Sequence, residues 1–285
     1  MRILKILLIA VLCSPSVLAW DRVGHLVVDA IAWEHMSERA RERAVELLRT
    51  APADADLALP GLTSRDLFLR TGYWPDVVRD EAWPARKEKY DRPTWHYVNH
   101  FWRDDGTSVP EMETNGELIE RLSSFDEVDS DPIELAWMLH LVGDIHQPLH
   151  SSARVTAREP EGDRGGNDFT LDDVESWGNL HAFWDSIQMR ARRKRHSESY
   201  SGWVDRIARE IMTLHPPESL ARELGVEGFE NWSQAGAELA MRSAYPHYLV
   251  RGARPPPRYQ DEVQEISDRQ LALAGYRLAA LMNDE

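Results

Sequence analysis

A helix that is apolar on nearly every side is the feature of this sequence that most constrains its fold. Its start is predicted at Asp131-Pro132-Ile133-Glu134, which supplies an N-cap, a proline at the first helical position and a capping-box acid. The predicted helix extends to about Ile145. Apolar residues lie on nearly all of its sides, namely Leu135, Trp137, Met138, Leu139, Leu141 and Val142. Such a helix is buried all round. His140 and Asp144, at positions i and i+4, share one of its faces.

Asp144 therefore needs a buried partner. An unpaired buried carboxylate is costly, and a metal ion is one of the few partners that offsets the cost. His150 follows just beyond the helix, and His181 and Asp185 repeat the i, i+4 spacing farther along the chain. Two such pairs with a histidine between them form a nitrogen and oxygen ligand set that suits zinc. One pair alone is also typical of a helical Asp–His hydrogen bond in an ordinary core, so that alternative stays open.

The sequence lacks the motifs of several other enzyme classes, and its composition is acidic. No Glu-x-x-His occurs, which disfavours a di-iron helix bundle. The chain also has no His-Glu-x-x-His, no Gly-x-Ser-x-Gly and no phosphate-binding loop. Its 33 Lys and Arg against 48 Asp and Glu give a formal charge of −15, which does not indicate a basic nucleic-acid groove of the usual kind.

Residues 1–19 are typical of a secretory signal peptide. A basic start precedes the apolar run Ile6–Cys13, and Val17-Leu18-Ala19 suits cleavage before Trp20. The run is too short for a membrane-spanning helix, and a buried N-terminal helix or a retained anchor is the alternative. Cys13 is the only cysteine, so the mature chain would have no disulfide. We therefore expect a periplasmic or secreted protein, with a bacterial periplasm or medium favoured by the missing disulfides.

Helical periodicity dominates the remaining chain. Amphipathic helices are predicted over residues 37–49 and 260–282. Strand-like alternation is scarce: residues 167–174 form a short hairpin at most, and the polar segment 151–166 is expected to be a long surface loop. The predicted fold class is all-α, with one compact helical domain over residues 20–285. No later segment has the length and apolarity to cross a membrane.

Several motifs occur in an order that resembles a known family. They are Trp20-Asp21-Arg22-Val23-Gly24-His25, Trp74-Pro75-Asp76, Trp95-His96-Tyr97-Val98-Asn99, the segment from His140 to His150, Gly165-Gly166-Asn167, and the segment from Asn179 to Asp185. Together they resemble the S1/P1 family of trinuclear zinc nucleases, relatives of the zinc-dependent bacterial phospholipases C. The resemblance runs from Trp20 to the last helix.

The resemblance implies a ligand set for three zinc ions. One zinc ion would be held by Asp76, His96, His140 and Asp144. A second would share Asp144 as a bridge and add His25 and the free amino group and carbonyl of Trp20. The third would bind His150, His181 and Asp185. Because the amino nitrogen of Trp20 is free only after cleavage, the precursor should lack a complete site.

The resemblance also implies residues that act on the substrate, each with an alternative. Arg79 matches an arginine that faces the phosphate, or it is a solvated helix cation. Tyr97 matches an aromatic ring that stacks on a base, or it is a core tyrosine. Asn167 either hydrogen-bonds substrate or shapes its loop. Asn99, a catalytic candidate, stands where the fungal pattern has aspartate, and its amide cannot act as a base. His146 is expected to hydrogen-bond a ligand residue.

The function implied is a zinc endonuclease that cuts RNA and single-stranded DNA to 5′-phosphorylated products. The same site would hydrolyse 3′-nucleotides, since only the leaving group changes. Water between two closely spaced metal ions is acidified. The three zinc ions carry six positive charges, against four carboxylate contributions when the bridging Asp144 is counted twice. The site is therefore net positive, and it attracts the phosphate locally despite the acidic composition of the chain. No stable membrane association and no protein partner are implied.

Two other functions use the same residues. A zinc-dependent phospholipase C would share metals and fold, but Asp185 stands where those lipases resemble one another in having glutamate, and no interfacial apolar segment is evident. An exported zinc-storage protein would need the ligands but no open coordination positions.

Overall fold

The computed structural model describes residues 20–284 except 104, 106, 108, 110, 126–129 and 174–177, so the predicted signal peptide lies outside the described residues. The helices are α1 (Arg22–His35), α2 (Glu38–Leu48), α3 (Ser64–Gly72), α4 (Trp74–Val77), α5 (Pro84–Tyr90), α6 (Leu118–Ser124), α7 (Pro132–Asp144), α8 (Leu180–Asp185), α9 (Ile187–Ala191), α10 (Tyr200–Leu214), α11 (Ala221–Leu224), α12 (Phe229–Ser243) and α13 (Pro257–Asp284). Short 3-10 helices are η1 (Ala53–Ala55), η2 (Pro148–His150) and η4 (Pro217–Leu220), and the strands are β1 (His100–Arg103) and β2 (Ser152–Val155).

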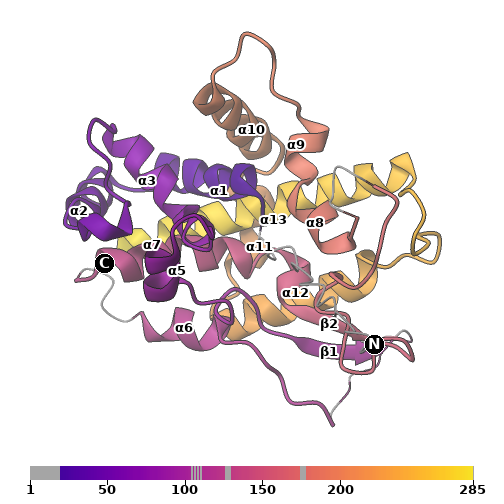
Figure 1. Cartoon of the computed structure of the whole chain (residues 1–285). Helices are drawn as coiled ribbons and strands as arrows, with labels where there is room; N and C mark the ends of the chain where they lie inside the picture. Colours follow the sequence, from indigo (N-terminus) through magenta and orange to yellow (C-terminus); the bar gives the residue numbers. More distant parts are fainter. Residues whose placement is uncertain are drawn as a thin grey trace, which may run out of the picture.

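The long helix α13 crosses the molecule, and the other helices are arranged around it (Figure 1). α1 packs along α13 and also contacts α10 and α3, while α7 contacts α3, α13 and α2. One large apolar core extends through these helices. The predicted mainly α, single-domain architecture is confirmed. Among the described helices, none combines the length and apolarity required to cross a membrane.

The three helices expected from the sequence form where their signals place them. The side chain of Ser37 accepts the amide of Ala40 and caps α2. Asp131 Oδ1 accepts the amide of Ile133 at 2.7 Å and caps α7, whose first residue is Pro132. Residues 135–153 are all buried, so α7 is enclosed on every side, as its all-round apolarity predicts.

A small parallel sheet was not expected from the sequence. β1 pairs with β2 in parallel, from His100 opposite Ser152 to Arg103 opposite Val155. β2 therefore lies inside the segment predicted to be a surface loop, and its first two residues are buried. The segment expected to be a hairpin contributes an isolated antiparallel bridge between Thr170 and Asn179, and its residues 174–177 are outside the described part. The sequence did not predict these strands because four residues are too few to show the alternation of apolar and polar residues that marks a strand. The strands form through pairing between segments that are distant in the sequence.

Gly275 allows a close contact between α13 and α1. A Cβ added there would lie 2.5 Å from both Cβ and Cγ2 of Ile31. Gly275→Ala should therefore push the helices apart and lower the free energy of unfolding by about 1–3 kcal/mol. Urea denaturation at fixed zinc concentration measures the loss. Gly225→Ala is the control: the atom nearest to its added Cβ is 3.4 Å away, so the change should stay below about 0.5 kcal/mol. Equal stability of the two variants would contradict this packing.

Candidate metal centre

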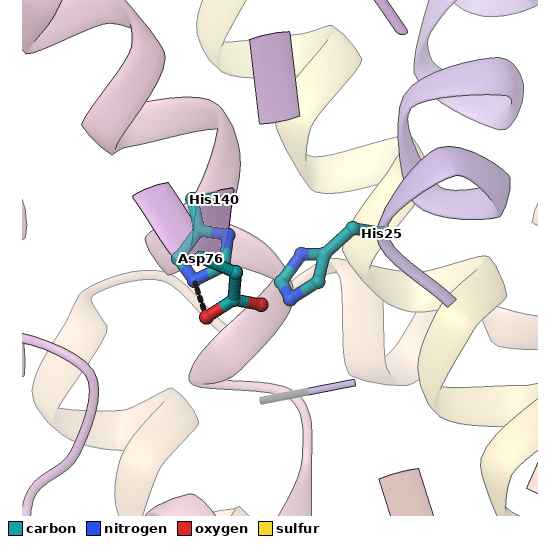
Figure 2. Close-up of side chains that lie close together, drawn as sticks. All are labelled: His25, Asp76 and His140. Atoms are coloured by element: carbon teal, nitrogen blue, oxygen red, sulfur yellow. Dashed lines mark ion pairs between the residues drawn. The ribbon is translucent and has the colours of Figure 1, made fainter. Parts of the chain in front are cut away.

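Five buried side chains from separate parts of the chain meet at one place, which we call the central cluster. They are His25 on α1, Asp76 on α4, His96 before β1, and His140 and Asp144 on α7. Ligand atoms of His25, Asp76 and His140 lie within 4.8 Å of one another, and so do those of His96, His140 and Asp144. His140 belongs to both groups, so the five residues are continuous. Figure 2 shows the Asp76 carboxylate beside the rings of His25 and His140, which stack at 4.0 Å between centroids.

Asp144 joins the histidines of the central cluster. Its Oδ2 lies 3.0 Å from His96 Nδ1 and 3.3 Å from His140 Nε2. Its Oδ1 lies 3.4 Å from His25 Nε2. Asp76 Oδ1 approaches His140 Nε2 to 3.9 Å, the ion pair drawn in Figure 2. Because the two oxygens of Asp144 face different histidines, this carboxylate has the arrangement of a bridge between two metal ions.

A second cluster consists of His150 on η2 with His181 and Asp185 on α8. His181 Nε2 lies 2.9 Å from His150 Nε2 and 3.6 Å from Asp185 Oδ2. The two clusters are adjacent, because His150 Nδ1 donates to the backbone oxygen of His96 at 2.6 Å. A second bond next to the small sheet adds to this connection. Val98 lies two residues before β1, and its amide donates to the backbone oxygen of His150 at 2.9 Å.

Backbone carbonyls fix the tautomers of three histidines. The Nδ1–O distances are 2.7 Å from His140 to Gly72, 2.6 Å from His150 to His96 and 2.7 Å from His181 to Gly165. A carbonyl oxygen only accepts, so each Nδ1 carries the proton and each Nε2 presents a lone pair. His150 and His181 therefore direct lone pairs at each other across 2.9 Å. That contact is repulsive unless a cation lies between them, and two nitrogens bound to one tetrahedral zinc are separated by roughly 3.3 Å.

Burial disfavours charge at these residues. It raises the pKa of Asp144 to about 6, against the opposing effect of His140. Burial also raises the pKa values of Asp76 and Asp185. It holds the pKa values of three histidines well below their usual range: His25, His96 and His150. A divalent cation binds such neutral imidazoles and supplies the counter-charge that the carboxylates need.

Several polar atoms of the central cluster have no hydrogen-bond partner among the residues that the structure describes. They are both ring nitrogens of His25, Oδ2 of Asp76, Nε2 of His96 and Oδ1 of Asp144. A buried polar atom without a partner costs about 1–3 kcal/mol. Divalent metal ions bound by these atoms would remove that cost. The donor set therefore fits metal, and its mixture of imidazole nitrogen and carboxylate oxygen suits zinc.

Trp20 is held next to both clusters. Its buried indole donates Nε1–H to the backbone oxygen of Gly143 at 3.1 Å, one residue before Asp144. The following amide, that of Asp21, donates to the backbone oxygen of Asp185 at 3.1 Å. Cleavage before Trp20 would thus free an amino group beside the central cluster. That cleavage stays a prediction, because the signal segment is not in the described part of the chain.

Arg79 lies against the central cluster rather than in solvent. Its Nη1 lies 3.4 Å from Asp76 Oδ1 and its Nε lies 3.5 Å from Asp91 Oδ1. Only 11% of the side chain is exposed, so the solvated helix cation considered from the sequence does not describe it. Asp91 was not identified from the sequence, because nothing in its local pattern relates it to Asp76.

The other substrate candidates lie on two partly buried segments. Tyr97 and Asn99 are half-buried and follow His96 toward β1. Asn99 Nδ2 donates to Asn115 Oδ1 at 2.8 Å, so a residue that the sequence did not single out fixes its amide. Asn167 Nδ2 donates to the backbone oxygen of Arg164 at 2.8 Å, a contact that shapes the loop.

Gln147 takes the supporting position that was expected of His146. Gln147 is fully buried, and its Nε2 donates to Asp185 Oδ1 at 2.7 Å. His146 instead donates Nδ1–H to the backbone oxygen of Val142 and accepts from Arg277 at Nε2, both at 2.7 Å. Burial and the Arg277 charge lower the pKa of His146 to about 3, so it is a neutral acceptor. The expectation for His146 was wrong because its ring faces α13 rather than the ligands.

Comparisons with known proteins agree with this geometry. A family model described as S1/P1 Nuclease matches residues 20–285, and the chain therefore belongs to the S1/P1 nuclease family. It is 23% identical to Nuclease P1 of Penicillium citrinum over 285 residues, which cover 93% of this chain and 97% of that protein. It is 23% identical to Endonuclease 1 of Arabidopsis thaliana, with 99% and 92% covered. Endonuclease 4 of the same plant is 26% identical, with 93% and 89% covered.

Family membership confirms the resemblance drawn from the sequence motifs and the enzyme class, a nuclease, that it implied. The described residues also contain three His and Asp groups that could hold metal ions, and every predicted His and Asp ligand belongs to at least one of these groups. Only the group of His150, His181 and Asp185 has the same members as a predicted ligand set. The roles of individual side chains stay predictions.

Gly165 carries the carbonyl that orients His181. Its φ is +60°, and an added Cβ would lie 2.3 Å from the backbone oxygen of Leu149. Gly165→Ala should displace this carbonyl and weaken zinc binding at the second cluster by about 10–100-fold. Competition with a chromophoric chelator measures the affinity. Gly61→Ala is the matched control, since Gly61 has a φ of +83° but no atom within 4 Å of an added Cβ. Equal zinc affinity in both variants would show that the Gly165 carbonyl has no such role.

Proposed function

We propose that the protein is a zinc-dependent endonuclease that hydrolyses single-stranded DNA and RNA to 5′-phosphate products and also hydrolyses 3′-nucleotides. The observation that carries the proposal is the convergence of imidazole lone pairs and carboxylates in two adjacent buried clusters. Membership of a nuclease family supports the phosphodiester as the bond attacked. The relatives named Nuclease P1 and Endonuclease 1 support nucleic acid as the substrate.

Three zinc ions would be held by the two clusters together with the amino group and carbonyl of Trp20. The proposed ligands are Trp20, His25, Asp76, His96, His140, Asp144, His150, His181 and Asp185. When bound, zinc supplies Lewis acidity toward water and toward the phosphate oxygens. We further propose that residues 1–19 are removed before Trp20 and that the enzyme acts in the periplasm or outside the cell.

The surrounding side chains would orient the nucleic acid. Arg79, held by Asp76 and Asp91, would donate charge-assisted hydrogen bonds to the oxygens of the scissile phosphate. Tyr97 would stack on a base, a contact that tolerates any base and suits single strands. Asn99 would offer its amide to that base while Asn115 holds it in place. Asn167, whose Nδ2 is held by the backbone oxygen of Arg164, would offer its amide oxygen to the substrate.

Processing at Trp20 should determine zinc content and activity together. Protein that begins at Trp20 should contain close to three zinc ions per chain by elemental analysis and cleave single-stranded DNA. A chelator should abolish this cleavage and added zinc should restore it. Protein that retains Ala19 should bind about one zinc ion fewer and cleave more slowly, because an amide nitrogen is a poor metal donor.

The same preparations separate the other functions. Three bound zinc ions without chelator-sensitive cleavage of any phosphodiester would indicate zinc storage. Hydrolysis of phosphatidylcholine dispersions in preference to single-stranded DNA would indicate a phospholipase C. One zinc ion or none in active protein would contradict the ligand set.

Asp144→Asn tests the bridging carboxylate. Asparagine keeps the shape of the side chain but removes the charge and one oxygen that face His25, His96 and His140. Nuclease activity should fall by at least about 100-fold, because changes outside the ligand shell already cost 10–100-fold, and zinc content should fall as well. Asp261→Asn, an equal charge change at an exposed position of α13, is the control. Full activity with three zinc ions in Asp144→Asn would refute the mechanism.

A further inference from the structure

Arg22 is an exposed arginine one helical turn from a residue of the central cluster. It is the first residue of α1, and His25 follows three positions later. Residues three apart share one face of a helix and are separated by about 5 Å along its axis. Arg22 is therefore an exposed cation close to the buried His25.

Two tyrosine rings hold the Arg22 guanidinium. Its Cζ lies 4.7 Å from the ring centroid of Tyr200 and 5.9 Å from that of Tyr73. Tyr200 is the first residue of α10 and Tyr73 directly follows α3, and both of these helices contact α1. The Tyr73 ring also lies 6.4 Å from that of His25, which places this group directly beside the central cluster. Cation–π contacts of this kind fix a guanidinium without using its N–H donors.

The charge of Arg22 is not neutralised within the described part of the chain. Its contacts there are with the two rings, and no described carboxylate forms an ion pair with it. The neighbouring arginines differ: Arg79 pairs with Asp76 and Asp91, and Arg190 pairs with Asp173. In a chain with a formal charge of −15, an unpaired arginine held in place beside the metal centre is a local site for an anion.

We propose that Arg22, held between Tyr73 and Tyr200, binds a phosphate of the substrate strand that flanks the scissile phosphate. The inference rests on the proposed nuclease function and makes it specific: the enzyme favours polynucleotide over mononucleotide. Among the described residues, Arg22 forms no hydrogen bond or ion pair with a side chain of either metal cluster, so we assign it to the neighbouring phosphate and not to the reacting one. The N–H groups of a stacked guanidinium are free to form paired hydrogen bonds to phosphate oxygens.

Arg22→Gln tests the site in protein shown by N-terminal sequencing to begin at Trp20. Two substrates are compared: a single-stranded oligodeoxythymidylate, and 3′-AMP, which has no flanking phosphate. The ratio of kcat/KM for the oligonucleotide to kcat/KM for 3′-AMP should fall by about 3–10-fold at low salt. The slope of log kcat/KM for the oligonucleotide against log salt should decrease in magnitude by about 0.7, the value for one phosphate contact in a single strand. Arg39→Gln, an equal charge change at an exposed position of α2, should leave the ratio and the slope unchanged.

Two further variants separate charge from stacking. Arg22→Lys keeps the charge but loses the planar guanidinium, so its ratio should lie between those of wild type and Arg22→Gln. Tyr200→Leu removes the nearer ring and should also lower the ratio, whereas Tyr200→Phe keeps the ring and should preserve it.

Three results would overturn the proposal. The first is an unchanged ratio in Arg22→Gln. The second is an equal loss on both substrates, which would mean that Arg22 supports the metal centre. The third is a binding result, which decides the question if the proposed function itself fails and wild-type protein hydrolyses neither substrate. The affinity for the same strand is then measured by fluorescence anisotropy. Equal dissociation constants for wild type and Arg22→Gln would exclude the phosphate site.

Discussion

Two imidazole lone pairs facing each other at 2.9 Å inside a protein core are the interaction on which the rest of this structure depends. Neither His150 nor His181 can turn away, because each Nδ1 is bound to a backbone carbonyl. The same restraint applies to His140, beside the buried carboxylate of Asp144. The fold therefore holds, at a cost in desolvation, a set of atoms that bound cations would stabilise.

The residues of the two clusters come from elements that are far apart in the sequence. The proposed ligand side chains range from α1 to α8, so no local segment can assemble the centre, and metal binding would be coupled to the folding of the domain. The four-residue strands connect its two halves, since β1 follows His96 and β2 follows His150. Gln147 ties Asp185 to the end of the central helix. These contacts hold the proposed ligand side chains in place, and a metal site requires such support.

An acidic protein can attract an anionic substrate when its positive charge is local. Asp76 and Asp91 hold Arg79 against the central cluster, where the reacting phosphate would lie. Arg22 is held by tyrosine rings instead and keeps its charge for a second phosphate. Metal ions would add the largest charges at the centre. The net charge of the chain therefore says little about its partner, because the field near the site is set by a few side chains.

The sequence by itself determined the helices with strong local signals and the family, and it predicted the ligand residues that recur at helical spacing. α7 was predictable because its N-cap, its proline and its all-round apolarity act within one segment. Only the tertiary structure decided what depends on contacts between distant segments. It formed the parallel sheet, gave Gln147 the place expected of His146, paired Asn99 with Asn115, and placed the exposed Arg22 against the rings of Tyr73 and Tyr200. Side-chain direction at these positions follows from long-range packing, and the local sequence pattern carries no record of it.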